Sequence, residues 1–246
     1  MTKDHYGTPT EPGKNPWKDG QPGVPRSGLT SDRVSEFLNK AKPSPTAPRS
    51  GRVIFALDAT ASRKPTWDAA MTVQAQMFES TASLGTLSIS LVYYRGHDEC
   101  RASRWTTNAR ELMRYMTSIE CRAGSTQVKR MLQRALSETE REHVNAVIFV
   151  GDCFEESHHK DHCYALATSL REHETPVFIF QEGSNPYATE AFTQIAKLSD
   201  GSVCPFNSNS PETLRVLLEA VATLAVGGRQ ALSHEQREIL KLEHKP

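Results

Sequence analysis

The sequence has no long hydrophobic run and no excess of charge of one sign. Its two most apolar stretches, near Val147 and Leu217, are well short of the roughly 20 residues that a membrane-spanning helix needs. The formal net charge is zero at pH 7, and charges of one sign form no block along the chain. We therefore expect neither a membrane nor a nucleic acid as a partner.

Cysteine is also scarce. The chain has five cysteines, an odd number, and no two of them form a C-x-x-C motif. This pattern fits reduced thiols better than a disulfide framework, and the N-terminal residues contain no apolar stretch typical of a signal peptide. Both features predict a cytoplasmic protein.

Three common enzyme motifs are missing as well. The sequence has no G-x-x-x-x-G-K-[ST], no G-x-G-x-x-G and no G-x-S-x-G. These motifs respectively bind nucleotide phosphates, bind dinucleotides and present a serine nucleophile. The sequence therefore gives no reason to expect nucleotide hydrolysis, dinucleotide binding or nucleophile-elbow hydrolysis.

Proline divides the chain into unlike parts. Residues 1–50 hold 8 of the 14 prolines and few residues that build a core, so we predict a largely disordered segment with one short helix near 31–41. Residues 51–226 have the composition of one globular domain. Residues 227–246 are polar, with leucines at helical spacing, and predict a helical tail.

From residue 51 onward, short apolar runs alternate with amphipathic helical patterns. The runs predict strands at 52–58, 87–95, 102–107, 145–152, 176–182 and 202–206, and the patterns predict helices at 66–83, 108–119, 126–140, 160–173, 189–199 and 211–225. This alternation is typical of a doubly wound α/β fold, with a mostly parallel central sheet flanked by helices. The polar strand at 102–107 is expected to pair antiparallel at the sheet edge.

Oxygen-bearing side chains follow several of these strands. The first strand ends in DATAS, which places Asp58, Thr60 and Ser62 at every second position; Thr126 begins a predicted helix, and Asp152 ends the most apolar strand. Ligands bind α/β sheets at the carboxyl edge of the strands, where such loops meet. Carboxylate and hydroxyl oxygens suit hard cations, so these five residues predict a site for Mg²⁺, or for Mn²⁺ or Ca²⁺.

The three segments resemble the metal-ion-dependent adhesion site (MIDAS) of von Willebrand factor type A (VWA) domains, over about residues 50–226. The resemblance implies that Asp58 holds the cation through water, that Thr60 and Ser62 bind it directly, and that Thr126 and Asp152 complete the site. Two features depart from the family pattern. Thr60 replaces the more frequent serine, and Asp152 leads into Cys-Phe-Glu-Glu where a short Asp-Gly turn is more usual.

The resemblance also implies a function. VWA modules of this kind are interaction domains and not enzymes, and a partner's exposed Asp or Glu completes the coordination of the cation. Similarity to intracellular VWA proteins further suggests an adaptor of an ATPase or chaperone complex. Glu155 and Glu156 follow Asp152 closely enough to lie at the rim of the site, where they would tune a partner's approach or occupy the open coordination position.

Other interpretations of the same residues stay open. Asp58 is also placed as the nucleophile of a Mg²⁺-dependent phosphotransferase or phosphatase, although the second Asp that this chemistry usually has is replaced by Thr60. A VWA fold with a non-functional metal site is a further alternative, because each residue can also cap a turn or helix. The segment 153–163 carries possible zinc ligands at a spacing that fits no usual zinc module, namely Cys153, His158, His159, His162 and Cys163.

Overall fold

The computed structural model describes residues 50–65, 67, 86–206 and 225. The Pro-rich segment with its short helix and the C-terminal tail lie outside the described residues. The helices predicted at 66–83 and 211–225 lie almost entirely outside them as well. The domain boundaries proposed from the sequence therefore stay predictions.

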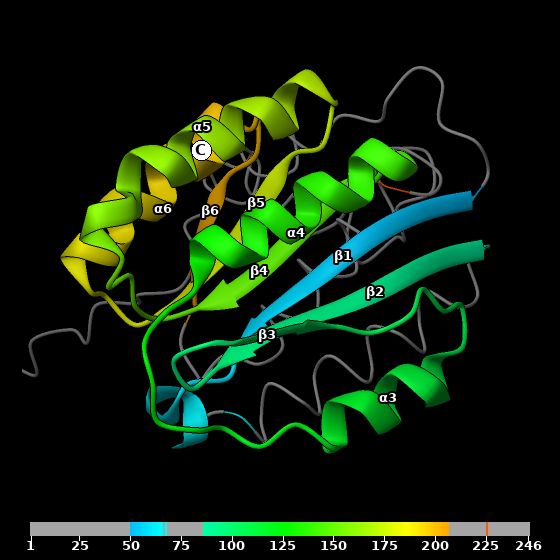
Figure 1. Cartoon of the computed structure of the whole chain (residues 1–246), viewed down its shortest axis with the longest axis horizontal. Helices are drawn as coiled ribbons and strands as arrows, with labels where there is room; N and C mark the ends of the chain where they lie inside the picture. Colours follow the sequence, from blue (N-terminus) through cyan, green and yellow to red (C-terminus); the bar gives the residue numbers. More distant parts are fainter. Residues whose placement is uncertain (1–49, 66, 68–85, 207–224, 226–246) are drawn as a thin grey trace, which may run out of the picture.

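A six-stranded sheet forms the centre of the described part of the chain (Figure 1). Its strands are β1 (Ser50–Asp58), β2 (Thr86–Arg95), β3 (Glu99–Ala102), β4 (Ala146–Gly151), β5 (Val177–Glu182) and β6 (Val203–Phe206), in the spatial order β3-β2-β1-β4-β5-β6. Every neighbouring pair is parallel except β2 and β3. The predicted fold class, a mostly parallel sheet with an antiparallel edge strand, is confirmed.

The edge strand lies earlier in the chain than predicted. The sequence suggested 102–107, whereas β3 covers Glu99–Ala102. Gly96 adopts φ +59, a left-handed conformation that suits glycine, and the chain turns so tightly there that Arg95 already pairs with Glu99. The predicted segment still follows the sheet, because Thr106 forms an isolated bridge with Ile89.

The described helices are α3 (Ala109–Thr117), α4 (Val128–Arg141), α5 (Lys160–Glu172) and α6 (Pro186–Leu198). They agree with four predicted helices, but α6 begins three residues earlier than expected. The reason is local: Asn185 accepts hydrogen bonds from the amides of Tyr187 and Ala188, and proline suits the first helical position. Within the described ranges, no helix is both long and apolar enough to cross a membrane.

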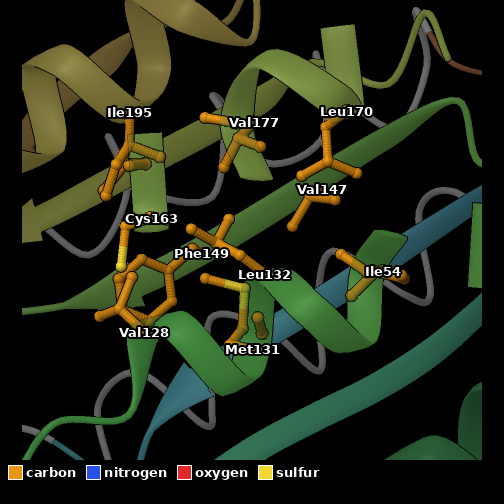
Figure 2. Close-up of a cluster of buried hydrophobic side chains, with 14 of the residues drawn as sticks. Ile54, Val128, Met131, Leu132, Val147, Phe149, Cys163, Leu170, Val177 and Ile195 are labelled. Carbon is orange, nitrogen blue, oxygen red and sulfur yellow. The ribbon is translucent and has the colours of Figure 1, made fainter. Parts of the chain in front are cut away.

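Alternate residues of the strands build the larger hydrophobic core. Ile54, Val147 and Val177 point from β1, β4 and β5 toward side chains of α4, α5 and α6 (Figure 2). Phe149 lies in this cluster, with its ring centroid 6.1 Å from that of Tyr94 and 5.6 Å from that of Phe192. The core thereby fixes three helices against one face of the sheet, whereas α3 contacts β2 and lies apart from them (Figure 1).

The parallel strands end at one edge of the sheet. The arrowheads of β1 and β4 point to this edge, and the short helix η1 (Ala61–Arg63), drawn in cyan, follows β1 there (Figure 1). A second short helix, η2 (Ser157–His159), lies between the loop that follows β4 and the start of α5. The loops that carry the predicted metal ligands all start at this carboxyl edge or run beside it.

Candidate metal-binding site

Asp58 is the last residue of β1, and its side chain is fully buried. One carboxylate oxygen, Oδ1, accepts a hydrogen bond from the backbone N–H of Thr60 at 2.8 Å, which folds the following loop back on the strand end. The other oxygen, Oδ2, accepts from the hydroxyl of Tyr94 at 3.0 Å. Tyr94 is the parallel partner of Asp58 on β2, so the sheet itself positions this donor.

The charge of Asp58 is poorly stabilised by its surroundings. Burial raises the pKa of its carboxyl from 3.8 to about 6, the hydrogen bonds from Thr60 and Tyr94 oppose this shift, and the negative charge of Asp152 adds to it. A divalent cation bound nearby would favour the ionised form further. The environment of Asp58 therefore fits the ligand or outer ligand of a positively charged ion.

Thr60 and Ser62 place their hydroxyl oxygens 3.1 Å apart. Thr60 is buried, whereas Ser62 is exposed. The alternation of the DATAS sequence turns both hydroxyls to one side of the loop. The two neutral oxygens form a pair that a hard cation can bind without losing its net charge.

The loop before α4 lies directly beside this first loop. The backbone N–H of Arg122 donates to the carbonyl of Ala59 at 3.0 Å, and Arg122 forms an isolated bridge with Thr60. A Cβ atom at Gly124 would lie only 2.0 Å from the carbonyl oxygen of Gly96, so this close approach requires glycine. The glycine thus brings the loop, and Thr126 with it, against the turn after β2.

Thr126 and Glu155 form a reciprocal pair. The Thr126 amide donates to Glu155 Oε2 at 3.1 Å, and the Glu155 amide donates to Thr126 Oγ1 at 2.9 Å. The neighbouring Glu156 accepts from the backbone amides of Val128 and Lys129 at the start of α4. The sequence placed both glutamates at the rim of the site, and the structure places Glu155 in contact with one of the predicted ligands.

Asp152 follows β4 and is half-buried. Its Oδ1 atom is buried, and no hydrogen-bond partner for it exists among the described residues. A buried carboxylate oxygen without a donor is energetically costly, and a bound cation is one way to satisfy it. Because its charge also raises the pKa of Asp58, the two predicted carboxylates lie close enough to act on one another.

Sequence reasoning missed two charged residues near the site. Arg63, in η1, is 1% exposed and forms an ion pair with Glu182 at the end of β5. Burial lowers the pKa of its guanidinium, and the charges of Asp152 and Asp58 counteract that effect. The only signal in the sequence was a basic residue directly after DATAS. Arg63 supplies a buried positive charge that acts on both carboxylates.

The segment 153–163 gives no support to a zinc site. In the described part of the chain, no three His, Cys, Asp or Glu side chains gather as metal ligands would. Cys163 is fully buried in the hydrophobic core, and burial raises the pKa of its thiol to about 12, which disfavours the thiolate that zinc requires.

The residues present therefore fit a hard cation. Hydrogen bonds join Asp58, Thr60 and Ser62 in one loop, and an electrostatic interaction joins Asp58 to Asp152. Thr126 is brought to the same edge by the backbone contacts of its own loop. All five candidate ligands carry oxygen, and two of them carry charge, as Mg²⁺, Mn²⁺ or Ca²⁺ prefer.

Comparison with known proteins identifies the fold. No protein-family profile and no curated protein matches the sequence, but solved structures do match. A von Willebrand factor type A protein from Catenulispora acidiphila aligns with 72% of this chain at 15% identity and a TM-score of 0.58. The VWA domain of SpRpn10 aligns with 68% at 14% identity and a TM-score of 0.54. The chain therefore has the fold of a VWA domain.

A third similar structure is proximal thread matrix protein 1 from the mussel byssus, which was solved with a zinc-occupied MIDAS motif. It aligns with 72% of this chain at 13% identity and a TM-score of 0.55. The chain spans 93% of the SpRpn10 domain, but only 43% of the Catenulispora protein and 46% of the mussel protein. The VWA fold predicted from the three sequence segments is confirmed by these likenesses.

Proposed function

We propose that this VWA-type domain binds a divalent cation through Asp58, Thr60, Ser62, Thr126 and Asp152, and that the cation recruits a protein partner through an exposed Asp or Glu. The carrying observation is the pair of carboxylates, one buried and one half-buried, at the carboxyl edge of the sheet. Asp152 has a buried oxygen without a hydrogen-bond donor among the described residues, and burial raises the pKa of the Asp58 carboxyl to about 6.

The hydrogen bonds of the site support a division of labour among the ligands. Both oxygens of Asp58 already accept a hydrogen bond, which suits a carboxylate that acts through water. Thr60 and Ser62 offer neutral oxygens for direct contact. A bound cation would supply an incompletely neutralised positive charge at the surface, and the chain's own residues would hold it there.

The likeness to other VWA structures adds support of a different kind. The mussel protein shows that a divalent cation occupies a MIDAS motif on this fold. The family resemblance implies Mg²⁺ as the cation here and an ATPase or chaperone complex as the setting. Mass spectrometry of proteins that the domain retains only in the presence of Mg²⁺ tests this finer assignment.

Titration calorimetry with Mg²⁺ and Mn²⁺ tests the cation site directly. We expect the unmodified protein to bind both ions and Asp58→Ala to bind neither. Asp161→Ala, which removes an exposed carboxylate from the start of α5, is the matched control and should bind as the unmodified protein does. Absence of binding to the unmodified protein would identify a VWA fold with a non-functional site.

A pull-down from cell extract tests the recruitment of a partner. The captured proteins should disappear in EDTA and with Asp58→Ala, and persist with Asp161→Ala. The same set of proteins in all four conditions would contradict a metal bridge.

The alternative enzyme has a separate test. Asp58 is fully buried with both oxygens engaged, which is a poor arrangement for attack on a phosphoester, and the residue two positions on is Thr60. We therefore propose no reaction at this carboxylate. Hydrolysis of p-nitrophenyl phosphate with Mg²⁺ that is lost in Asp58→Asn would establish the enzyme instead.

A further inference from the structure

An open recess of about 480 Å³, with several charged residues in its lining, lies against the loop that leads to Thr126. The turn after β2 and the strand β3 form one side of it, through residues 95–101. The loop before α4 forms the other side, through Arg122 and Ala123.

Three arginines surround one glutamate in this recess. Arg95 binds Glu99 with two nitrogens, Nε at 2.9 Å and Nη2 at 3.0 Å. Arg101 places its Nε 2.9 Å from the same carboxylate, and the nearest nitrogen of Arg122 is 3.9 Å away. A carboxylate has about four lone-pair positions, so Glu99 cannot satisfy three guanidinium groups of five N–H donors each.

The recess consequently carries an excess of positive charge. Its other acidic residue, Asp98, pairs with Arg130 at 2.8 Å and does not offset the three arginines. The side chains of Arg101 and Arg122 are 70% and 57% exposed, so their unused donors face solvent. This local excess occurs in a protein whose formal net charge is zero.

The recess and the candidate metal site share a loop. The Arg122 amide donates to the carbonyl of Ala59, and Arg122 bridges to Thr60, one of the proposed cation ligands. On the other side, the Ser125 amide donates to the carbonyl of Gly96 in the wall of the recess. The backbone of Arg122 therefore connects the recess to the loop that carries the first proposed ligands.

We propose that the recess binds a second carboxylate of the partner, so that the recognised segment is a peptide with at least two acidic residues. This inference rests on the proposed function, which assigns the first carboxylate to the cation. Guanidinium groups pair well with planar carboxylates. A carboxylate is proposed because the partner already presents an Asp or Glu to the cation; a phosphate, which the same arginines also attract, is the competing occupant that the test separates.

The test measures binding of a fluorescein-labelled hexaglutamate peptide by fluorescence anisotropy at low salt with Mg²⁺. The double variant Arg101→Gln/Arg122→Gln removes the exposed guanidinium groups and leaves the Arg95–Glu99 pair intact. We expect the double variant to bind the peptide about threefold to tenfold more weakly, because it loses two exposed ion pairs with the peptide and each such pair contributes little affinity. The control is Arg171→Gln, an exposed arginine in the last turn of α5, which should leave the affinity unchanged.

The outcomes separate this inference from the proposed function. Equal affinity of the double variant and the unmodified protein, or no binding of hexaglutamate to the unmodified protein, overturns the proposal that the recess binds a carboxylate. Tighter binding of a hexaphosphoserine peptide through the same arginines overturns the carboxylate assignment. If EDTA leaves the affinity unchanged while the double variant weakens it, the recess stands and the metal bridge fails. If only EDTA weakens it, the metal bridge stands and the recess fails.

Discussion

At the scale of single residues, Asp58 combines two satisfied hydrogen bonds with a poorly solvated charge. Asparagine keeps an acceptor oxygen and removes the charge. In EDTA, we expect Asp58→Asn to raise the free energy of unfolding by about 1–3 kcal/mol, because a charge that burial destabilises is lost. The same change should abolish Mg²⁺ binding. Urea denaturation and calorimetry measure the two effects, and a less stable variant in EDTA would contradict the first.

The raised pKa of Asp58 also predicts a pH dependence. In EDTA the folded protein holds this proton up to about pH 6, whereas the unfolded chain releases it near 3.8. The folded state therefore binds more protons in this interval, and stability falls as pH rises through it, by about 3 kcal/mol in total. The difference in free energy of unfolding between Asp58→Asn and the unmodified protein should be small near pH 4 and should reach its maximum near pH 7. Thermal unfolding shows this, and a gap independent of pH would refute it.

Tyr94 acts on the site through Asp58. Its hydroxyl is fully buried and, because burial holds its pKa well above 10, stays a donor to the carboxylate. We expect Tyr94→Phe to weaken Mg²⁺ binding and to lower the free energy of unfolding by about 1–2 kcal/mol. Tyr93→Phe is the matched control, since the Tyr93 hydroxyl contacts Glu99 outside the site at 3.4 Å. Similar effects of both variants on Mg²⁺ affinity would contradict the role of Tyr94.

Sequence reasoning at this scale proposed the cation ligands and missed the residues that contact or charge-balance them. Asp58, Thr60 and Ser62 follow from a two-residue period and a strand end, which are local features. Tyr94 supports Asp58 through the register between β1 and β2, which no local pattern encodes. Arg63 was missed because a charged side chain is rarely expected in the interior.

At the scale of elements, the start of α4 shows why the residue at which a helix begins is harder to predict from sequence than the presence of the helix. The sequence placed it at Thr126, but α4 begins at Val128, and the flanking Gln127 makes no side-chain capping bond. Glu156, 28 residues further along, accepts from the first amides instead. A cap supplied from another loop is invisible to local sequence rules, whereas the cap of α6 by Asn185 is local.

The distant cap makes a prediction for α4. Removing the Glu156 carboxylate leaves the Val128 and Lys129 amides without their acceptor and removes negative charge from a helix N-terminus. We expect Glu156→Ala to cost about 1 kcal/mol of stability and to speed hydrogen exchange at these two amides. Glu172→Ala, at the exposed end of α5, is the control and should change neither. Unchanged exchange at Val128 and Lys129 in Glu156→Ala would rule out the cap.

At the scale of the molecule, the fold class was predictable because it depends on many residues at once. Apolar strand runs alternating with amphipathic helices define a mostly parallel sheet, and errors of a few residues at β3 or α6 do not change that result. The contacts between loops were not predictable, because they depend on side chains that the sheet order brings together. The ion pair between Arg63 and Glu182 is such a contact: it joins η1 after β1 to the end of β5, although β4 lies between these strands.

This ion pair leads to a prediction about the balance of charge in the whole domain. Arg63 interacts favourably with Asp58 and Asp152 as well as with Glu182, so Arg63→Met leaves three carboxylates without their buried counter-charge. In EDTA we expect a loss of about 3–5 kcal/mol, as for other buried pairs broken on one side. Mg²⁺ should restore more stability to Arg63→Met than to the unmodified protein, because a bound cation then replaces the missing charge and no guanidinium repels it.

The variant Arg63→Met/Glu182→Gln removes one uncompensated carboxylate and should recover part of the loss. Thermal unfolding with and without Mg²⁺ measures all three proteins, and equal stabilisation of each by Mg²⁺ would show that Arg63 and the cation site are not coupled.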